Sequence, residues 1–335
     1  PPRSTLFPYT TLFRSRIHVM PLVRFALTAL TVIQAAAAVS AADEGALRVS
    51  VRKDSTAGGL NVEHPGLPGN VLAYLSCEGV VFGYNRESTP LFEVKVSGDP
   101  TAEEPRWDLS DGVFSYSFTY DQGIRVNFRA VPQGERLKLR YTLTNVSEKP
   151  LERVLLHTCV PTTEAPAFFP GFVESPVHEP EKTGNYMGFY DRTFLWSGER
   201  AFTVGGTEKG REEIHLSFTR TGQRPVEWGW WNNGPEGFDL PLIALASADG
   251  KHTAALGFDR ADWASCNGGD DRACFHLFPL FGDLQPGQSA TVEGCFYVMR
   301  GSPEEVRKRF VRDFPGVGAG TPTKQTVNKN TGSDR

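Results

Sequence analysis

The stretch Leu137-Lys-Leu-Arg-Tyr-Thr-Leu-Thr-Asn145 alternates apolar and polar side chains from its first residue onward. Successive side chains of a β-strand point to opposite faces, so this period of two predicts a half-buried strand. The same alternation recurs, at least in part, in residues 47–52, 114–120, 124–128, 213–218 and 291–298. Turn residues separate the segments, at 58–59, 68–69, 121–123, 132–134, 249–250 and 286–287. Short strands with turns at this spacing predict an all-β protein whose antiparallel sheets pack as a two-sheet sandwich.

One helix is predicted near the end of the chain. Ser302 is a good N-cap, Pro303 suits the first helical position, and Glu305 completes a capping box. Apolar side chains then recur at every fourth residue, at Val306, Phe310 and Phe314. This spacing predicts one apolar stripe that docks the helix on the sandwich.

Composition limits the class of protein. The chain has 335 residues, of which 39% are hydrophobic and 22% charged, so it can bury a sizeable core and is not a disordered or collagen-like chain. The net charge of −4 argues against a nucleic-acid partner. After residue 41 no apolar run is long enough to span a membrane. We expect a single sandwich domain over residues 42–315 and a disordered tail over residues 316–335.

The N-terminal region has two unusual segments. Residues 5–15 resemble the translation of a common sequencing-library adapter, so we interpret residues 1–19 as an artefact and Met20 as the natural start. A secretory signal peptide is predicted over residues 20–41, because Arg24 is followed by an apolar run and then by small residues. The mature protein is therefore expected to be periplasmic or secreted. A short N-terminal membrane anchor is the alternative.

Five cysteines follow the predicted signal. Cys266 and Cys274 bracket a short polar loop and are the best candidates for a disulfide, since export permits one. Cys77, Cys159 and Cys295 lie in apolar, strand-like runs, and for these three we favour buried free thiols.

Two segments carry a family resemblance. The first begins with the predicted strand over residues 137–145 and a turn at residues 148–150. It ends with Leu155-Leu-His157-Thr-Cys159, which precedes a long loop. The second is Leu284-Gln-Pro-Gly-Gln288 with the strand over residues 292–298. Both resemble the galactose mutarotase-like sandwich proteins, which include sugar epimerases and sandwich domains of polysaccharide lyases and glycosidases. The resemblance implies a supersandwich fold that faces a carbohydrate ligand.

The resemblance also indicates candidate catalytic residues. A sugar epimerase needs a general base and a general acid at the sugar ring. The strand-end histidine of the family corresponds to His157, whereas the epimerase glutamate on the strand before the Pro-Gly turn is replaced by His276. His178 and Glu179, in the long loop, could also exchange protons or bind a metal. The alternatives are a hydrogen-bonded histidine at a sheet rim for His157, a core histidine for His276, and a solvated loop for the other two.

A tryptophan-rich segment is a candidate for sugar binding. In an extended chain Trp228 and Trp230 point to one face and form a flat apolar platform, with Asn232 and Asn233 as partners for hydroxyl groups. The alternative is a plug at the end of the hydrophobic core. Trp231 points to the opposite face, and we expect it to lie near the rim together with Trp107, Trp196 and Trp263.

Hard oxygen ligands gather in the loop around Asp270 and Asp271, which makes calcium a candidate there, with a plain polar surface loop as the alternative. Apart from this loop and the pair His178 and Glu179, no metal site is predicted, and no organic cofactor is predicted. The leading hypothesis is an exported protein that binds or modifies carbohydrate. The alternatives are a non-catalytic structural or interaction protein of the cell envelope and a glycoside hydrolase with a carboxylate pair. Convergence of His157 and His276 in space would favour catalysis; the sequence does not indicate an oligomeric state.

Overall fold

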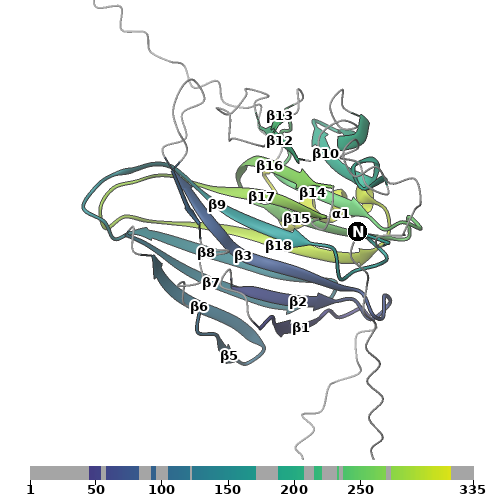
Figure 1. The fold of residues 1–335 in the computed structure, drawn as a ribbon, viewed down its shortest axis with the longest axis horizontal. Coiled ribbons are helices and arrows are strands. Elements are labelled where there is room, and N and C mark those ends of the chain that lie inside the picture. Colours follow the sequence, from purple (N-terminus) through teal and green to yellow (C-terminus); the bar gives the residue numbers. More distant parts are fainter. Residues whose placement is uncertain are drawn as a thin grey trace, which may run out of the picture. The chain divides into compact units, whose positions relative to one another are not determined.

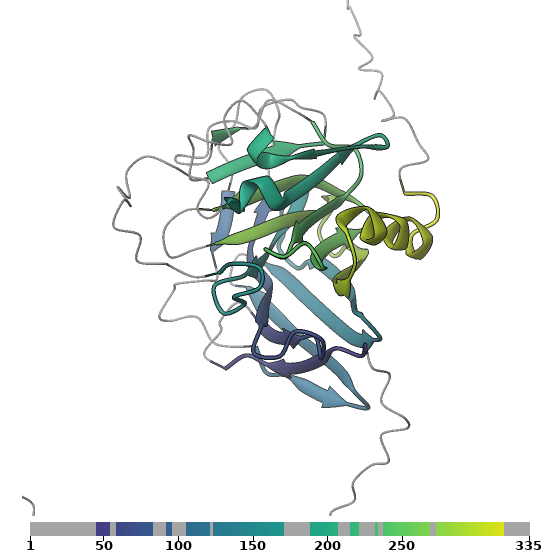
Figure 2. The same cartoon turned by 90° about the vertical axis from the view of Figure 1, so that its right-hand side faces the viewer.

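The structure is a computed structural model. It describes residues 45–53, 58–82, 92–95, 105–120, 123–170, 188–206, 215–220, 232–233, 237–268 and 273–317. Within these ranges the chain forms two nine-stranded sheets and one α-helix (Figures 1 and 2). The predicted all-β sandwich class is therefore confirmed.

The first sheet, which we call sheet A, consists in spatial order of β1 (Arg48–Val51), β2 (Gly59–Glu63), β3 (Val71–Phe82), β9 (Leu151–Pro161), β17 (Cys274–Leu284), β16 (Ala261–Asn267), β12 (His215–Thr219) and β13 (Asn232–Asn233), with β4 (Phe92–Lys95) paired to β3. The second, sheet B, consists of β11 (Arg200–Thr203), β10 (Thr193–Ser197), β14 (Leu242–Ala246), β15 (His252–Phe258), β18 (Ser289–Arg300), β8 (Arg136–Asn145), β7 (Ile124–Gln133), β6 (Val113–Tyr120) and β5 (Asp108–Ser110). Pairing is antiparallel except between β12 and β13, which run parallel.

The main hydrophobic core lies between the two sheets. The strand quoted at the outset is β8, and its odd-numbered apolar residues, Leu137 to Leu143, are buried in this core. Tyr141 of β8 and Tyr74 of β3 meet there with their hydroxyl oxygens 2.5 Å apart. The Tyr141 hydroxyl also donates to the carbonyl of Ser76 at 2.9 Å. Both phenols are fully buried, and burial raises the pKa of each far above its usual range, so they bridge the sheets as neutral groups.

Helix α1 (Pro303–Asp313) confirms the sequence-based prediction in detail. Both halves of the capping box are formed between Ser302 and Glu305. The helix lies against sheet B, on the side away from the main core (Figure 2). Of the predicted stripe, Val306 and Phe310 are buried there and Phe314 is partly buried. Gly257 of β15 allows this close approach, because a Cβ atom there would lie 2.5 Å from Cε2 of Phe310.

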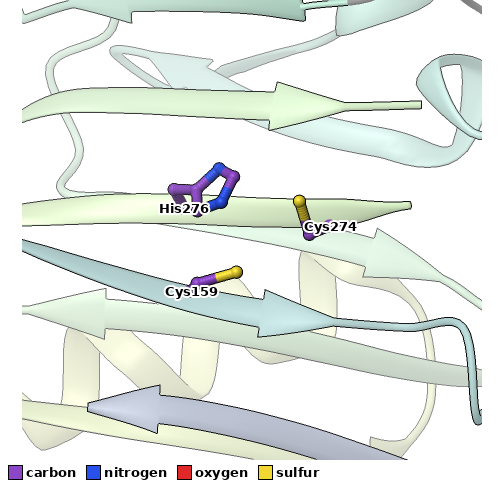
Figure 3. A group of neighbouring side chains, drawn as sticks. All are labelled: Cys159, Cys274 and His276. Carbon is purple, nitrogen blue, oxygen red and sulfur yellow. The ribbon is translucent and has the colours of Figure 1, made fainter. Parts of the chain in front are cut away.

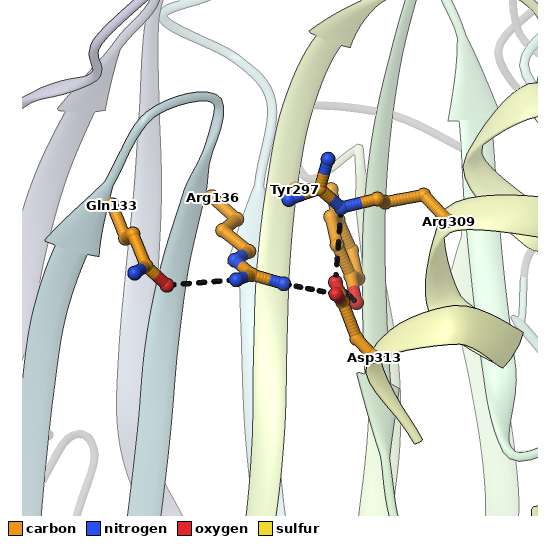
Figure 4. A network of polar contacts seen from close by, with 5 residues as sticks. All are labelled: Gln133, Arg136, Tyr297, Arg309 and Asp313. Atoms are coloured by element: carbon orange, nitrogen blue, oxygen red, sulfur yellow. Dashed lines mark hydrogen bonds and ion pairs between the residues drawn. The ribbon is translucent and has the colours of Figure 1, made fainter. Parts of the chain in front are cut away.

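A polar network holds the end of α1 to sheet B (Figure 4). The Asp313 carboxylate forms an ion pair with Arg136 and accepts hydrogen bonds from the Tyr297 hydroxyl at 2.9 Å and from Arg309 at 3.3 Å. Gln133 accepts from Arg136 at 2.7 Å. Burial alone would raise the pKa of Asp313, but the Arg136 and Tyr297 hydrogen bonds outweigh it and lower that pKa.

Two predictions about buried residues are wrong. Trp196 and Trp263 are 0% and 1% exposed, so they are not rim residues. All five cysteine side chains are buried and none forms a disulfide, so the proposed Cys266–Cys274 bridge is absent. Cys266 points into the main core, whereas Cys274 lies on the opposite face of sheet A, so the polar loop between them cannot bring the two thiols together. For Cys77, Cys159 and Cys295 the prediction of buried thiols outside any disulfide is confirmed.

Within the described residues, no helix has the length and apolarity that a membrane crossing needs.

Candidate active site

A cluster of ionisable side chains lies on the face of sheet A that is turned away from the main core. On β9, Leu156 and Val160 point into the core, so His157 and Cys159 point outward. On β17 the core residues are Phe275 and Leu277, and the outward residues are Cys274, His276 and Phe278. Because β9 and β17 are paired, with Cys159 opposite His276, the outward side chains of the two strands are neighbours.

An irregularity in β3 adds a carboxylate to this face. Leu75 is paired with Cys159 and Gly79 with His157, so four steps along β3 correspond to two along β9. In an unbroken strand Glu78 would share the face of Tyr74 and Val80, which are core residues. The extra residues turn Glu78 outward instead, where its carboxylate reaches both histidines.

The three side chains converge closely. Oε2 of Glu78 lies 3.3 Å from Nε2 of His157 and 3.8 Å from Nε2 of His276. The two imidazole rings have their centroids 4.9 Å apart. The side chains are 16%, 9% and 4% exposed for Glu78, His157 and His276 respectively, so solvent reaches the group mainly at the carboxylate.

Neighbouring side chains fix the orientation of both rings. The His157 ring is stacked on Phe278, with centroids 4.6 Å apart and planes 9° apart, and Phe278 is stacked in turn on Trp263. The hydroxyl of Ser265 lies 3.2 Å from Nδ1 of His276. Burial lowers the pKa of His276, so its imidazole is neutral at neutral pH. A neutral imidazole beside a carboxylate can both accept and donate a proton.

Two thiols adjoin the histidines. Cys159, Cys274 and His276 each offer a ligand atom, and these atoms lie within 4.8 Å of one another (Figure 3). The hydrogen bond from Cys159 lowers the pKa of the Cys274 thiol, whereas burial raises the pKa of Cys159. The thiol and imidazole groups therefore form one continuous patch on β9 and β17.

The structure brings together some of the predicted site residues. His157 and His276 converge as the leading hypothesis required. Asn232 and Asn233 form β13, whose backbone pairs with β12. Residues outside the described ranges are His178, Glu179, Trp228, Trp230, Trp231, Asp270 and Asp271. Glu78 is the main site residue that the sequence analysis did not predict, because it lies in an apolar, strand-like segment without a recognisable motif.

A second histidine pair lies elsewhere. His64 and His252 have ring centroids 5.5 Å apart, and Nε2 of His64 lies 3.3 Å from Oε1 of Glu135. A pocket of about 520 Å³ opens near the polar network of α1, lined by residues that include Gln133, Glu135 and Arg309. None of its lining residues belongs to the cluster of Glu78 and the two outward histidines.

No protein-family model matches the chain, and no curated protein matches its sequence. Solved structures are similar to it. A galactose mutarotase-related enzyme from Lactobacillus acidophilus is 9% identical, with 77% of this chain and 96% of that chain covered and a TM-score of 0.40. A galactose mutarotase-like protein from Clostridium acetobutylicum is 10% identical, with 76% and 93% covered and a TM-score of 0.39. An alpha-N-acetylgalactosaminidase from Bifidobacterium bifidum is 10% identical, with 79% and 38% covered and a TM-score of 0.41. At such identities these similarities assign neither a residue nor a reaction to this chain.

Proposed function

We propose that this protein is an exported carbohydrate-binding or carbohydrate-modifying β-sandwich whose acid–base centre consists of Glu78, His157 and His276. The observation that carries the proposal is the convergence of one carboxylate and two imidazoles from three strands. The sequence is compatible with a catalytic protein and with a purely structural one. Convergence of the two histidines favours the catalytic hypothesis.

The chemistry follows from the arrangement of the three groups. Glu78 is the most exposed of them, so a substrate hydroxyl meets the carboxylate first. A proton accepted there can pass to His157, whose Nε2 lies 3.3 Å away, while His276 provides a second acceptor or donor. Stacking on Phe278 holds the His157 ring in place during such a transfer.

The choice of saccharide as substrate comes from the strands around His157 and from residues 284–298, which resemble the galactose mutarotase-like family. The hydrolase alternative needs two carboxylates that face each other. Among the described residues, the cluster of converging ligand atoms contains Glu78 as its carboxylate, together with two histidines. Acid–base catalysis by a carboxylate and two imidazoles is therefore better supported than hydrolysis by a pair of carboxylates.

The test is a screen of binding and activity with site variants. Glycan arrays and calorimetry would identify a poly- or oligosaccharide ligand, and NMR of that ligand would follow anomer exchange, elimination or hydrolysis. Loss of a general acid or base lowers rates by about 10² to 10⁴-fold, which is expected for Glu78→Gln and His157→Gln. His64→Gln is the matched control, because His64 is also a buried histidine beside a glutamate but lies outside the cluster.

Two outcomes would contradict the proposal. Absence of binding to every saccharide would exclude the substrate class. Binding and turnover that are unchanged in Glu78→Gln and His157→Gln would exclude the centre and favour a scaffold whose sugar site lies elsewhere.

A further inference from the structure

The geometry points to a transition-metal site formed by Cys159, Cys274 and His276, which binds Zn²⁺ with two thiolates and one imidazole. This site shares His276 with the acid–base centre proposed above, but it requires no saccharide and is tested by metal binding alone. The three ligand atoms lie within 4.8 Å of one another and all three residues are buried (Figure 3). Two thiolates and an imidazole are ligands that Zn²⁺ prefers.

The spacing fits a tetrahedral ion. With Zn–S bonds of about 2.3 Å and Zn–N bonds of about 2.0 Å, ligand atoms around tetrahedral zinc lie roughly 3.5 to 3.8 Å apart. Ligand atoms that are already within 4.8 Å can reach this spacing by small side-chain rotations. The sheet keeps the backbone in place, because Cys159 and His276 are directly opposite each other on paired strands.

The strand register disfavours the obvious competitor, a Cys159–Cys274 disulfide. Cys274 is paired with Pro161, so Cys159 is its diagonal neighbour rather than its direct partner. Diagonal positions on paired strands lie about 7 to 8 Å apart, beyond the Cα separation that a disulfide tolerates without backbone movement. A metal ion spans that separation, whereas an S–S bond does not.

The electrostatics of the patch also favour a cation. Glu78 and the two cysteines place three groups that can become anionic on one poorly solvated surface. Buried negative charges are costly unless a cation compensates them. When Zn²⁺ binds, each thiol that still carries a proton releases it to solvent, and the two thiolates neutralise the ion.

Three protein ligands leave a fourth position of a tetrahedral ion open. His276 belongs both to this ligand set and to the group with Glu78 and His157, so the ion would lie beside the proposed acid–base centre. A ligand or water at the open position would therefore be close to the Glu78 carboxylate.

Metal titration of the full chain tests this site directly. The reduced, metal-free protein would be titrated anaerobically with Zn²⁺ against a chromophoric chelator, and with Co²⁺, whose thiolate charge-transfer absorption reports sulfur ligands. One equivalent of metal with this absorption is expected. Cys159→Ser and Cys274→Ser should each weaken Zn²⁺ binding by about 100-fold or more, since each removes a direct ligand.

Cys266→Ala is the matched control, because Cys266 is a buried thiol on the adjacent strand that faces the opposite side of sheet A. Its variant should bind metal as the unmodified protein does. Binding without thiolate absorption, equal affinity in Cys159→Ser, or no binding at all would overturn the site. A Cys159–Cys274 cross-link in non-reducing peptide mapping, with no metal bound after reduction, would identify a redox pair instead. Saccharide binding is measured separately, so either proposal can fail alone.

Discussion

At the scale of single residues, Gly257 shows how closely α1 is fitted to sheet B. Adding a Cβ atom there would place it 2.5 Å from Phe310 and 3.1 Å from Leu242. Gly257→Ala should therefore lower the free energy of unfolding by about 1 to 3 kcal/mol, as overpacking does. Urea denaturation followed by tryptophan fluorescence would measure the loss.

Phe310→Leu serves as the partner in a double-mutant cycle. If the Gly257 effect arises from contact with this ring, Gly257→Ala should cost less in the Phe310→Leu background than alone. Additive losses in the two variants would mean that the helix does not depend on that contact.

Individual site residues were only partly predictable from the sequence. His157 and His276 stand out because histidine can exchange protons at neutral pH and because both occupy strands of recognisable pattern. Glu78 carries no such signal, since its outward direction depends on a local change of register against β9. The Cys–His ligand set was missed for a related reason. Its members come from β9 and β17, which are distant in sequence and become neighbours only through sheet pairing.

At the scale of the element, the C-terminal end of α1 should respond to acid. The folded protein lowers the pKa of Asp313 through Arg136 and Tyr297, despite the opposing effect of burial. Such a carboxyl contributes stability that is present above its unfolded pKa, near 3.9, and is lost as the pH falls through the lower folded value. The free energy of unfolding should therefore decrease below about pH 4 as this ion pair is protonated.

Asp313→Asn isolates that contribution. The variant should be less stable by about 1 to 3 kcal/mol at neutral pH, because Arg136 and the Tyr297 hydroxyl lose a charged acceptor. Its stability should also fall less steeply below about pH 4. Asp108→Asn, on the exposed strand β5, should match the unmodified protein in both respects. An acid profile of Asp313→Asn identical to that of the parent would show that another group causes the decline.

Elements with regular patterns were predicted well, and connections were not. All six alternating segments overlap strands of the structure, and the capping signals located α1. The disulfide prediction failed because a short loop does not determine side-chain direction. Cys266 is on the core face of sheet A and Cys274 is on the opposite face. The burial of Trp196 and Trp263 was missed because polar neighbours in sequence do not exclude burial outside the main core. Each of the two tryptophans belongs to its own smaller hydrophobic cluster.

At the scale of the whole molecule, export of the chain can be tested without knowing its substrate. Expressed from Met20 in a Gram-negative host, the protein should be found in the periplasm with Ala42 as its first residue. Cell fractionation and N-terminal sequencing would show this. Leu30→Arg interrupts the apolar run and should retain the protein in the cytoplasm with residues 20–41 attached. A membrane-bound product that still begins at Met20 would support the anchor alternative.

Because β3 pairs irregularly with β9, the number of residues between Leu75 and Gly79 decides whether the Glu78 carboxylate faces the two histidines. A homologue that lacked the two additional residues would pair regularly with β9, and a glutamate aligned with Glu78 would then point among the core residues beside Tyr74. Such a chain could lose its carboxylate by deletion while an alignment still counted the glutamate as conserved. Gap positions between Leu75 and Gly79, rather than residue identity at position 78, would therefore mark which homologues keep this centre.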